Sequence, residues 1–430
     1  MRVLSDESSK QQISCDILAT EINKAYSFIN EKNIVKLLFE KDAALWHKDA
    51  TQTKEIAQRL GWLTLPDNQE KHIESLCKFS KEIKEECFTH AVLLGMGGSS
   101  LCSEVARETF GSANGYPQLL VLDNTSPEAI LDLQKKINIE KTLFIVASKS
   151  GGTEETLSFF HYFYDILQAK NFNNPGNNFV AITDEATPLV KIANQFYFRK
   201  TFLNQPDLGG RYSVLSDFGL VPMALMGVDI EALLYSAKLM ELSSKNTNLA
   251  ANPAVNLGVT LGVCQQHKKD KVTFVLSPSI SSFGYWVEQL LAESTGKEGQ
   301  GLIPVNGEKL GTPDVYQNDR VFIHMHLSSD DNISDTHKLQ VLQQAGHPVI
   351  SIEVKDKLAL GAEYYRWEIV AAIAGLIMNI NPFDQPNVEE SKKNTKDILA
   401  DWEKDGSFKK ATPVIEAQGI SIYADAKTEH

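Results

Sequence analysis

The stretch Leu143-Phe-Ile-Val-Ala-Ser-Lys-Ser-Gly-Gly-Thr-Glu-Glu-Thr156 shows how this chain is built. Leu143–Ala147 is short, apolar and uninterrupted, which is typical of a strand buried on both faces of a parallel sheet. The residues that follow are mostly glycines, serines and threonines, and beyond Thr156 the apolar residues recur at helical spacing. A strand, a polar loop and a helix in this order form the repeating unit of a doubly wound α/β sheet.

The same alternation extends in both directions along the chain. A first group of strands belongs with Leu143–Ala147, and a second group begins near Val272, after a helical connection over residues 217–268. Two sheets of similar design are therefore expected in tandem. The other predicted strands are Ala91–Leu94, Leu119–Leu122, Phe179–Ile182, Val272–Leu276, Arg320–His326 and Pro348–Ile352.

We therefore predict an α/β fold with two tandem doubly wound domains, mainly parallel sheets, and helical segments at both ends of the chain. The predicted divisions are a helical N-terminal segment at 1–85, a first α/β domain at 86–225, a second α/β domain with connecting helices at 226–400, and a polar tail at 401–430.

The composition is that of a water-soluble globular protein. Of the 430 residues, 43% are hydrophobic and 23% are charged, and the net charge is −13. A diffusely acidic surface argues against binding to nucleic acid or to an anionic membrane. The longest apolar run, Ile369–Met378, is too short to cross a bilayer, and the polar Met1–Gln12 does not resemble a signal peptide. The five cysteines form no CxxC pair and no Cys/His cluster, so we expect reduced thiols, no metal site and a cytoplasmic protein.

The loop at Ser148–Thr156 is a candidate phosphate site. Its hydroxyl groups can surround an anion together with the backbone N–H groups and the dipole of the helix that it opens. The Walker A pattern is absent, so nucleotide hydrolysis is not implied. The alternative interpretation is a helix N-cap rich in hydroxyl groups. The hydroxyl-bearing residues are Ser148, Ser150, Thr153 and Thr156.

The segment Trp286–Lys297 combines an apolar helix face with a carboxylate near the helix end. Gln289 and Glu293 lie one turn apart on an adjoining stripe, and a polar turn follows at Ser294–Lys297. A half-buried carboxylate in this position can act as a general base. The alternative is an ordinary amphipathic helix that ends in Gly and Lys.

Three further motifs carry polar groups that could serve the same site. Gly95–Ser100 follows a strand and lets the backbone approach a ligand, although its last residue is a serine where a dinucleotide fingerprint has its third glycine. Asp207–Ser213 places two glycines before Arg211, and Asn381–Lys393 follows an apolar helix. A surface arginine in a turn and solvated lysines are the alternative interpretations of the last two motifs.

Taken in order, these motifs resemble the phosphoglucose isomerase family over roughly residues 35–395. They read GMGGSS, SKSGGTEET, GGRYS, EQLLAESTGK and NPFDQPNVEESK. The resemblance implies two tandem sugar-isomerase (SIS-type) domains with the active site between them, and aldose–ketose isomerisation through an enediol(ate). It also implies glucose 6-phosphate and fructose 6-phosphate as substrates, no cofactor, and a possible homodimer. The segment Glu55–Trp62 is most similar to the isomerase portion of transaldolase–phosphoglucose isomerase fusions.

By position, the resemblance assigns a role to each motif. Glu293 would move a proton between C1 and C2, Arg211 would stabilise the enediolate, and Lys392 would take part in ring opening and substrate binding. Proton abstraction next to a carbonyl needs such a positioned base and a partner for the developing oxyanion, and a guanidinium stays charged in that role. The residues that would contact the sugar or hold the phosphate are Gly98, Ser99, Ser148, Lys149, Ser150, Thr153, Thr156 and Gln289.

One departure from the family concerns ring opening. The family has a glycine-rich loop ending in Gln-His after the catalytic glutamate, and that histidine helps to open the pyranose ring. The corresponding stretch, Val305–Asp314, contains neither residue. His324 and His326 fall in a predicted strand, where packing is expected. The alternatives are that Lys392 or Lys149 assists ring opening, or that ring opening is less assisted.

Three other functions stay open at this point. A non-catalytic sugar-phosphate-binding module could keep the phosphate loop and lose Glu293 and Arg211, so the presence of both residues favours an enzyme. An isomerase that also accepts mannose 6-phosphate is possible, because discrimination between C2 epimers depends on fine pocket shape. A nicotinamide-dependent dehydrogenase is disfavoured by the incomplete dinucleotide fingerprint.

Overall fold

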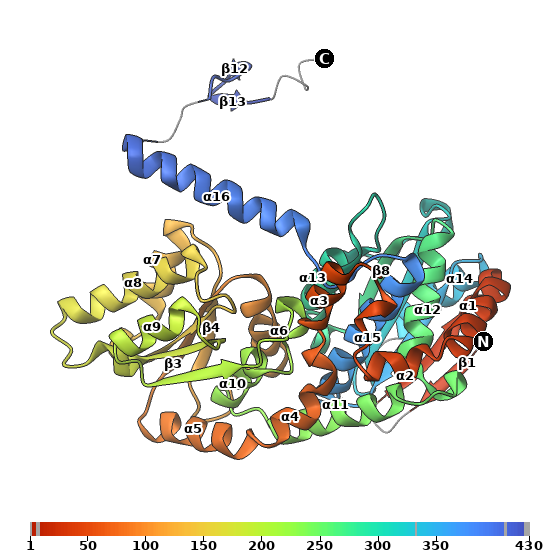
Figure 1. Ribbon diagram of the computed structural model, residues 1–430, viewed down its shortest axis with the longest axis horizontal. Helices are drawn as coiled ribbons and strands as arrows, with labels where there is room; N and C mark the ends of the chain where they lie inside the picture. Colours follow the sequence, from red (N-terminus) through yellow and green to blue (C-terminus); the bar gives the residue numbers. More distant parts are fainter. Residues whose placement is uncertain (1, 6–8, 332, 408–410, 425–430) are drawn as a thin grey trace. The chain divides into compact units, whose positions relative to one another are not determined.

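Two α/β sheets, both within Met1–Phe383, form the main part of the fold (Figure 1). The computed structural model describes residues 2–5, 9–331, 333–407 and 411–424. A separate unit, Asp384–His430, follows the main part.

The first sheet is parallel throughout, with the strand order β4-β3-β5-β6-β7. Successive side chains point to opposite faces of a strand, so Val92 and Phe144 pack toward α8 and α9, whereas Leu93 and Ile145 pack toward α5, α6 and α10. Helices on both faces explain why the central strands are unbroken apolar runs. The strands are β3 (His90–Gly95), β4 (Gln118–Leu122), β5 (Thr142–Ala147), β6 (Phe179–Asp184) and β7 (Lys200–Asn204), and the helices are α5 (Ile73–Glu85), α6 (Leu101–Phe110), α7 (Pro127–Lys136), α8 (Glu154–Ala169), α9 (Pro188–Gln195) and α10 (Asp217–Leu225).

The second sheet repeats this strand order. Its strands run β9-β8-β10-β11, which matches β4-β3-β5-β6, and these four are parallel. The buried helix α15 packs against α11, α12 and α13, and one hydrophobic core extends from these helices to the near face of the first sheet. The elements are β8 (Lys271–Leu276), β9 (Ile303–Asn306), β10 (Arg320–Leu327), β11 (Val349–Val354), α11 (Ile230–Ser244), α12 (Pro253–Gln266), α13 (Phe283–Thr295), α14 (Ile333–Gln344) and α15 (Leu360–Met378). The prediction of two tandem, mainly parallel sheets is confirmed.

The N-terminal segment is only partly helical, which corrects the prediction for residues 1–85. After β1 (Arg2–Ser5), β2 (Ser9–Ser14) adds to the second sheet antiparallel to β11. Ser9 and Gln11 are buried on this strand. Their side chains accept hydrogen bonds from the buried guanidinium of Arg366, and these bonds offset the cost of burying polar groups. Inward-facing polar side chains leave no apolar alternation, and this explains why the sequence did not predict a strand. The predicted helices follow as α1 (Ala19–Glu31), α2 (Ile34–Phe39), α3 (Ala50–Ala57) and α4 (Leu65–Glu70).

Two edge strands, β7 and β9, were also not predicted. Both have partly exposed and polar residues, because an edge strand has a neighbour on one side only. The divisions proposed near residues 85, 225 and 400 remain predictions.

The C-terminal unit contains one long helix and a hairpin. Helix α16 (Pro386–Asp405) is followed by β12 (Ile415–Ala417) and β13 (Ile420–Ile422), which pair antiparallel. The residues predicted as a polar tail at 401–430 therefore include the last turn of a helix and a short hairpin.

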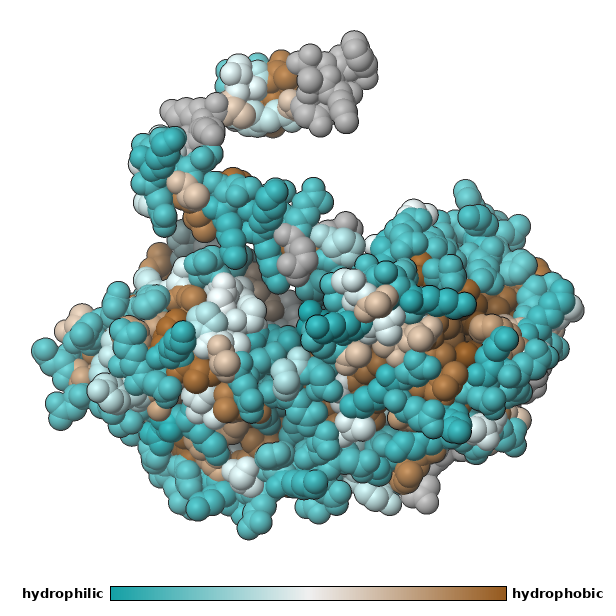
Figure 2. Space-filling view, viewed as in Figure 1, coloured by the Kyte–Doolittle hydropathy of each residue, from teal (hydrophilic) through white to brown (hydrophobic). Residues whose placement is uncertain are grey.

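Figure 2 shows one side of the molecular surface, on which residues 1–383 are mainly hydrophilic, in keeping with the acidic composition. Across the described part of the chain, no helix has the length and the apolar character needed to span a bilayer.

Candidate active site

Helix α13 presents the predicted base at its C-terminal end. Glu293 is half-buried, and Gln289 lies one turn before it on the same face. The Gln289 amide donates a hydrogen bond of 2.9 Å from Nε2 to Oε1 of Glu293. The other amide atom, Oε1 of Gln289, is buried and has no hydrogen-bond partner among the described residues. A buried acceptor without a donor is costly unless a ligand supplies one.

The guanidinium of Arg211 reaches the same carboxylate from the turn η7 (Gly210–Tyr212). Its Nη1 donates to Oε2 of Glu293 over 3.4 Å, and the Arg211 side chain is only 2% exposed. Two further bonds fix the group: Nε donates to Ser294 Oγ at 2.8 Å, and Nη2 donates to the Pro382 carbonyl at 2.8 Å. A buried cation needs such partners to offset its lost hydration. The arginine is thus fixed beside the base.

The glycine-rich turn after β3 packs directly against both groups. A Cβ at Gly98 would lie 2.5 Å from the Gly210 carbonyl oxygen and 3.0 Å from the Arg211 nitrogen. Gly97 has a φ of +55°, and a Cβ there would lie 3.2 Å from Nε2 of Gln289. Glycine is required for this close approach. Ser99 belongs to the same turn, η4 (Gly97–Ser99), and is half-buried.

The predicted phosphate loop lies between the end of β5 and the start of α8. Ser148 is buried, and its hydroxyl lies 2.9 Å from that of Thr153, whereas Ser150 is exposed and accepts from the Gly152 N–H at 3.4 Å. Thr156 is fully buried, and its Oγ1 lacks a hydrogen-bond partner within the described ranges. The loop thus offers hydroxyl groups and the unpaired N–H groups of a helix start to an anion.

Lys149, also assigned to phosphate binding, is held by a neighbouring strand end. Its Nζ lies 2.5 Å from Oδ2 of Asp184, the last residue of β6. Burial raises the pKa of the Asp184 carboxyl, although the lysine opposes that shift. Asp184 was missed by sequence reasoning; the signal that could have found it is its place at the carboxyl end of a central strand.

The register of the first sheet brings the phosphate loop next to the glycine-rich turn. Gly95 and Ala147 are paired neighbours on β3 and β5, so the two loops leave the same edge of the sheet side by side. The glycine-rich turn in turn touches Arg211 and Gln289. This arrangement gathers the predicted phosphate loop, a cation and a carboxylate around one edge of the first sheet.

Lys392 and the histidines of the predicted strand are the other residues that the sequence brought into the question of ring opening. Lys392 is exposed on α16, in the C-terminal unit, and its predicted role stays a prediction. His324 is packed in β10, as expected; its ring stacks on His326 at 4.5 Å, and burial lowers its pKa to about 4. Tyr212 and Ser294, which hold Arg211, were not singled out from the sequence, although each adjoins a predicted site residue.

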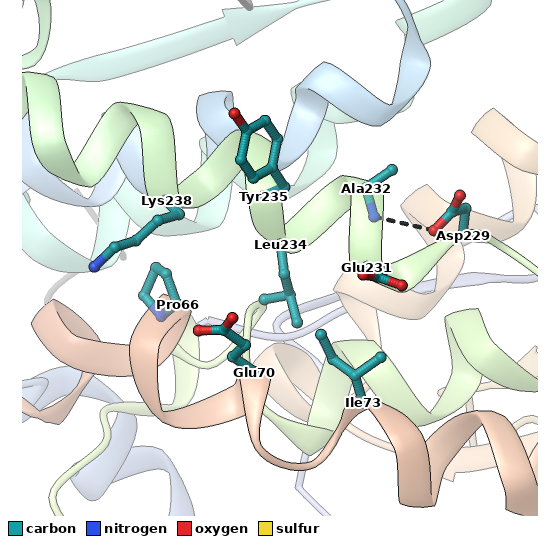
Figure 3. Close-up of a pocket in the computed structure, with 9 residues that line it drawn as sticks. All are labelled: Pro66, Glu70, Ile73, Asp229, Glu231, Ala232, Leu234, Tyr235 and Lys238. Atoms are coloured by element: carbon teal, nitrogen blue, oxygen red, sulfur yellow. Dashed lines mark hydrogen bonds between the residues drawn. The ribbon is translucent and has the colours of Figure 1, made fainter.

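A separate cavity of about 380 Å³ lies between α4 and α11 (Figure 3). Glu70, Glu231 and Lys238 line it together with apolar side chains, and Asp229 accepts from the Ala232 N–H at 3.0 Å to cap α11. The predicted site residues lie elsewhere, so this cavity is not the candidate active site.

Comparison with known proteins agrees with the geometry. The sequence model of the family described as phosphoglucose isomerase matches residues 73–302, which is more than half of the chain. The chain belongs to the phosphoglucose isomerase family. It is therefore an aldose–ketose isomerase. A protein of Methanococcus maripaludis named "Probable glucose-6-phosphate isomerase" is 30% identical over 418 residues, covering 87% of this chain and 90% of that protein. Glucose-6-phosphate isomerase of Mycoplasmopsis pulmonis is 27% identical, with 79% of this chain and 90% of that protein covered.

Solved structures share the fold. A glucose-6-phosphate isomerase from Chlamydia trachomatis superposes with a TM-score of 0.74 at 16% identity, covering 94% of this chain and 90% of that one. A hypothetical protein from Thermus thermophilus gives a TM-score of 0.75 at 23% identity, covering 91% of this chain and 100% of its own. At these identities the likeness concerns the fold alone.

Proposed function

We propose that this phosphoglucose isomerase family member interconverts glucose 6-phosphate and fructose 6-phosphate by proton transfer through an enediol(ate). The observation that carries the proposal is the Glu293 carboxylate, held by Gln289 and Arg211 beside the glycine-rich turn. The relatives that share up to 30% identity carry the same substrate in their names.

In the proposed reaction, Glu293 removes the proton from C2 of the open-chain aldose, the electron pair of the broken C2–H bond forms the C1–C2 double bond, and the C1 carbonyl oxygen becomes an oxyanion. The proton of the C2 hydroxyl then passes to the C1 oxyanion. As the C2 oxygen becomes the ketose carbonyl, the electron pair of the double bond takes up the proton from Glu293 at C1. Arg211 is fixed within 3.4 Å of the base, where its charge can stabilise that oxyanion. The phosphate would rest on Ser148, Lys149, Ser150, Thr153 and Thr156, and the sugar on Gly98, Ser99 and Gln289. The unpartnered oxygens of Thr156 and Gln289 support these assignments.

The deciding experiment compares three forms of the full-length chain in a coupled fructose 6-phosphate assay: the unchanged chain, Glu293→Gln and Glu288→Gln. Glu288 is the matched control because it is exposed on the same helix. We expect Glu293→Gln to lower kcat by roughly 10²–10⁴-fold with KM retained, the usual contribution of a general base. Normal turnover by Glu293→Gln would remove Glu293 as the base.

Solvent deuterium provides a second readout. Proton transfer through Glu293 predicts deuterium at C2 of the recovered aldose, whereas a direct hydride shift gives none. Substrate binding by the unchanged chain without turnover would instead support a sugar-phosphate-binding module. Turnover of mannose 6-phosphate would identify a dual-specificity isomerase.

We also propose a cytoplasmic location and a homodimer. The five cysteines, all within the described ranges, are free thiols, which supports a reducing compartment. The dimer rests on the family resemblance, and light scattering of the purified chain tests it through the molar mass.

A further inference from the structure

The turn that carries Arg211 is held from outside the matched family region by residues Arg59–Leu63, called here the Gly61 segment. The Gly61 N–H donates to the Asp207 carbonyl at 2.8 Å, and Arg59 Nη1 donates to the Leu208 carbonyl at 3.4 Å. A Cβ at Gly61 would lie 2.2 Å from Oδ1 and 2.8 Å from the backbone oxygen of Asp207. Only glycine therefore allows this contact, since the backbone of the Asp207 loop would have to move.

Trp62 continues the contact into the site. Its indole is fully buried and stacks on the Tyr212 ring, with centroids 5.3 Å apart and planes 29° from parallel. On its other side the Gly61 segment is anchored to α15, because the Tyr365 hydroxyl donates to the Leu63 carbonyl at 2.9 Å. Phe383 packs against Tyr212 at 5.4 Å, so that ring is confined by several neighbours.

Tyr212 shares its polar partners with Arg211. The Tyr212 hydroxyl lies 3.1 Å from Ser294 Oγ and donates to the Pro382 carbonyl at 3.4 Å, and these are the two atoms that hold Nε and Nη2 of Arg211. A shift of the Tyr212 ring would therefore disturb the bonds of the guanidinium to Ser294 and Pro382. The contacts form one continuous path from Gly61 to the carboxylate of Glu293.

We propose that the Gly61 segment positions Arg211 for the reaction. Gly61 and Trp62 are positioning residues that set where the guanidinium meets the developing oxyanion. This inference rests on the proposed role of Arg211. The phosphate loop follows β5 and is held by β6 and α9 and not by Gly61 or Trp62, so we expect substrate capture not to depend on these two residues. The segment should therefore control kcat and leave KM nearly unchanged.

The test is Gly61→Ala in the full chain. We expect kcat to fall by roughly 10–100-fold, because a displacement of about 1 Å at a catalytic group has effects of that order. KM should stay within about twofold, and the isotope effect on kcat with C2-deuterated glucose 6-phosphate should rise as proton transfer becomes slower than other steps. Turnover by the unchanged chain tests the proposed function separately. If that turnover is normal, an unchanged kcat in Gly61→Ala overturns this inference alone.

A double-mutant cycle tests whether Gly61 acts through Arg211. In an Arg211→Lys background, Gly61→Ala should lower kcat little further, because the guanidinium that Gly61→Ala would displace is already absent. If the fold-loss of kcat in the double variant equals the product of the two single losses, Gly61 acts independently of Arg211 and the inference is overturned.

Trp62→Phe is the second test variant if Gly61→Ala does not fold. This change keeps an aromatic ring beside Tyr212 and removes part of the stacked area. Phe163→Leu is the control for general destabilisation, because Phe163 on α8 is fully buried and stacks on Phe144 of β5. We expect Trp62→Phe to lower kcat and raise the isotope effect, and Phe163→Leu to change neither. If both variants lose only stability, the segment has no positioning role.

Discussion

At the scale of single residues, Glu293 combines a fixed orientation with access to a ligand. Its two oxygens accept from different donors, at 2.9 Å from Gln289 and 3.4 Å from Arg211, while the side chain stays 27% exposed. The longer bond belongs to the charged donor, which has already formed two shorter bonds with Ser294 and Pro382. The arginine is therefore held mainly by Ser294 and Pro382 and less closely by Glu293.

Asp217 is a buried residue whose charge opposes folding. Burial raises the pKa of its carboxyl to about 6, above the ordinary value of 3.8. Because the folded-state pKa is the higher one, the folded chain holds this proton more tightly, and the stability from Asp217 is lost as the pH rises from about 4 through 6.

Asp217→Asn should remove this pH dependence. We expect the variant to be more stable than the unchanged chain at pH 7, by up to ~3 kcal/mol, with the difference shrinking toward pH 4. Urea unfolding of both chains at several pH values measures this difference in the free energy of unfolding. Asp132→Asn, at an exposed position, is the control and should shift the midpoint little at any pH. A constant difference between Asp217→Asn and the unchanged chain across this range would contradict the assignment.

At the scale of elements, the strands made of apolar residues were predictable, including the edge strand β4, whereas the more polar β2, β7 and β9 were not. β5 and β8 are covered by helices on both faces, so their sequences contain little except apolar residues. β2 buries serine and glutamine against a buried arginine, a pairing that appears only once the chain has folded. β7 and β9 have polar exposed positions that resemble loops in sequence.

The same distinction explains the candidate site. Glu293, Arg211 and the phosphate loop were found because their motifs are local in sequence and recur in a known family. Asp184, Ser294 and the Trp62–Tyr212 stack depend on contacts between distant segments, which no local pattern records.

Gln11 on β2 offers a test of how the N-terminal strand is held. Its Nε2 donates to the Pro253 carbonyl at 3.0 Å, and its Oε1 accepts from buried Arg366. Gln11→Leu should lower the free energy of unfolding by roughly 1–3 kcal/mol, because it leaves buried polar groups unpaired. Thermal unfolding measures the loss, and kcat at 25 °C should not change. Lys10→Gln is the control on the same strand, where an exposed ion pair with Glu353 contributes little. Equal Tm values for the two variants would contradict the prediction.

At the scale of the whole molecule, the proposed site draws on both halves. The first sheet supplies the phosphate loop and the turn around Gly98, and α13 of the second half supplies Glu293 and Gln289. The halves share one hydrophobic core, so a substrate held by the first half can be presented to the base without independent movement of the two sheets.

Lys392, on α16, is the residue to which the family resemblance assigns a part in ring opening. Lys392→Met should lower kcat by about 10-fold or more, if an ammonium group assists ring opening as a general acid. Lys393→Met is the matched control, because it removes the same charge from the next position of the same helix. Steady-state assays that measure kcat for both variants test this prediction. Equal activities would contradict a role for Lys392 and would leave two alternatives, Lys149 or a less assisted ring opening.

The pairing of β2 with β11 has a consequence for the order in which this protein can be made. Ser14 forms a register pair with Val349, so β2 cannot complete its pairing with β11 until the chain around Val349 has been synthesised. At the usual ~5–20 residues per second, synthesis of the intervening chain takes on the order of tens of seconds. All the strands of the first sheet emerge during that wait, whereas β2 keeps one edge open to hydrogen bonding until β11 has been made.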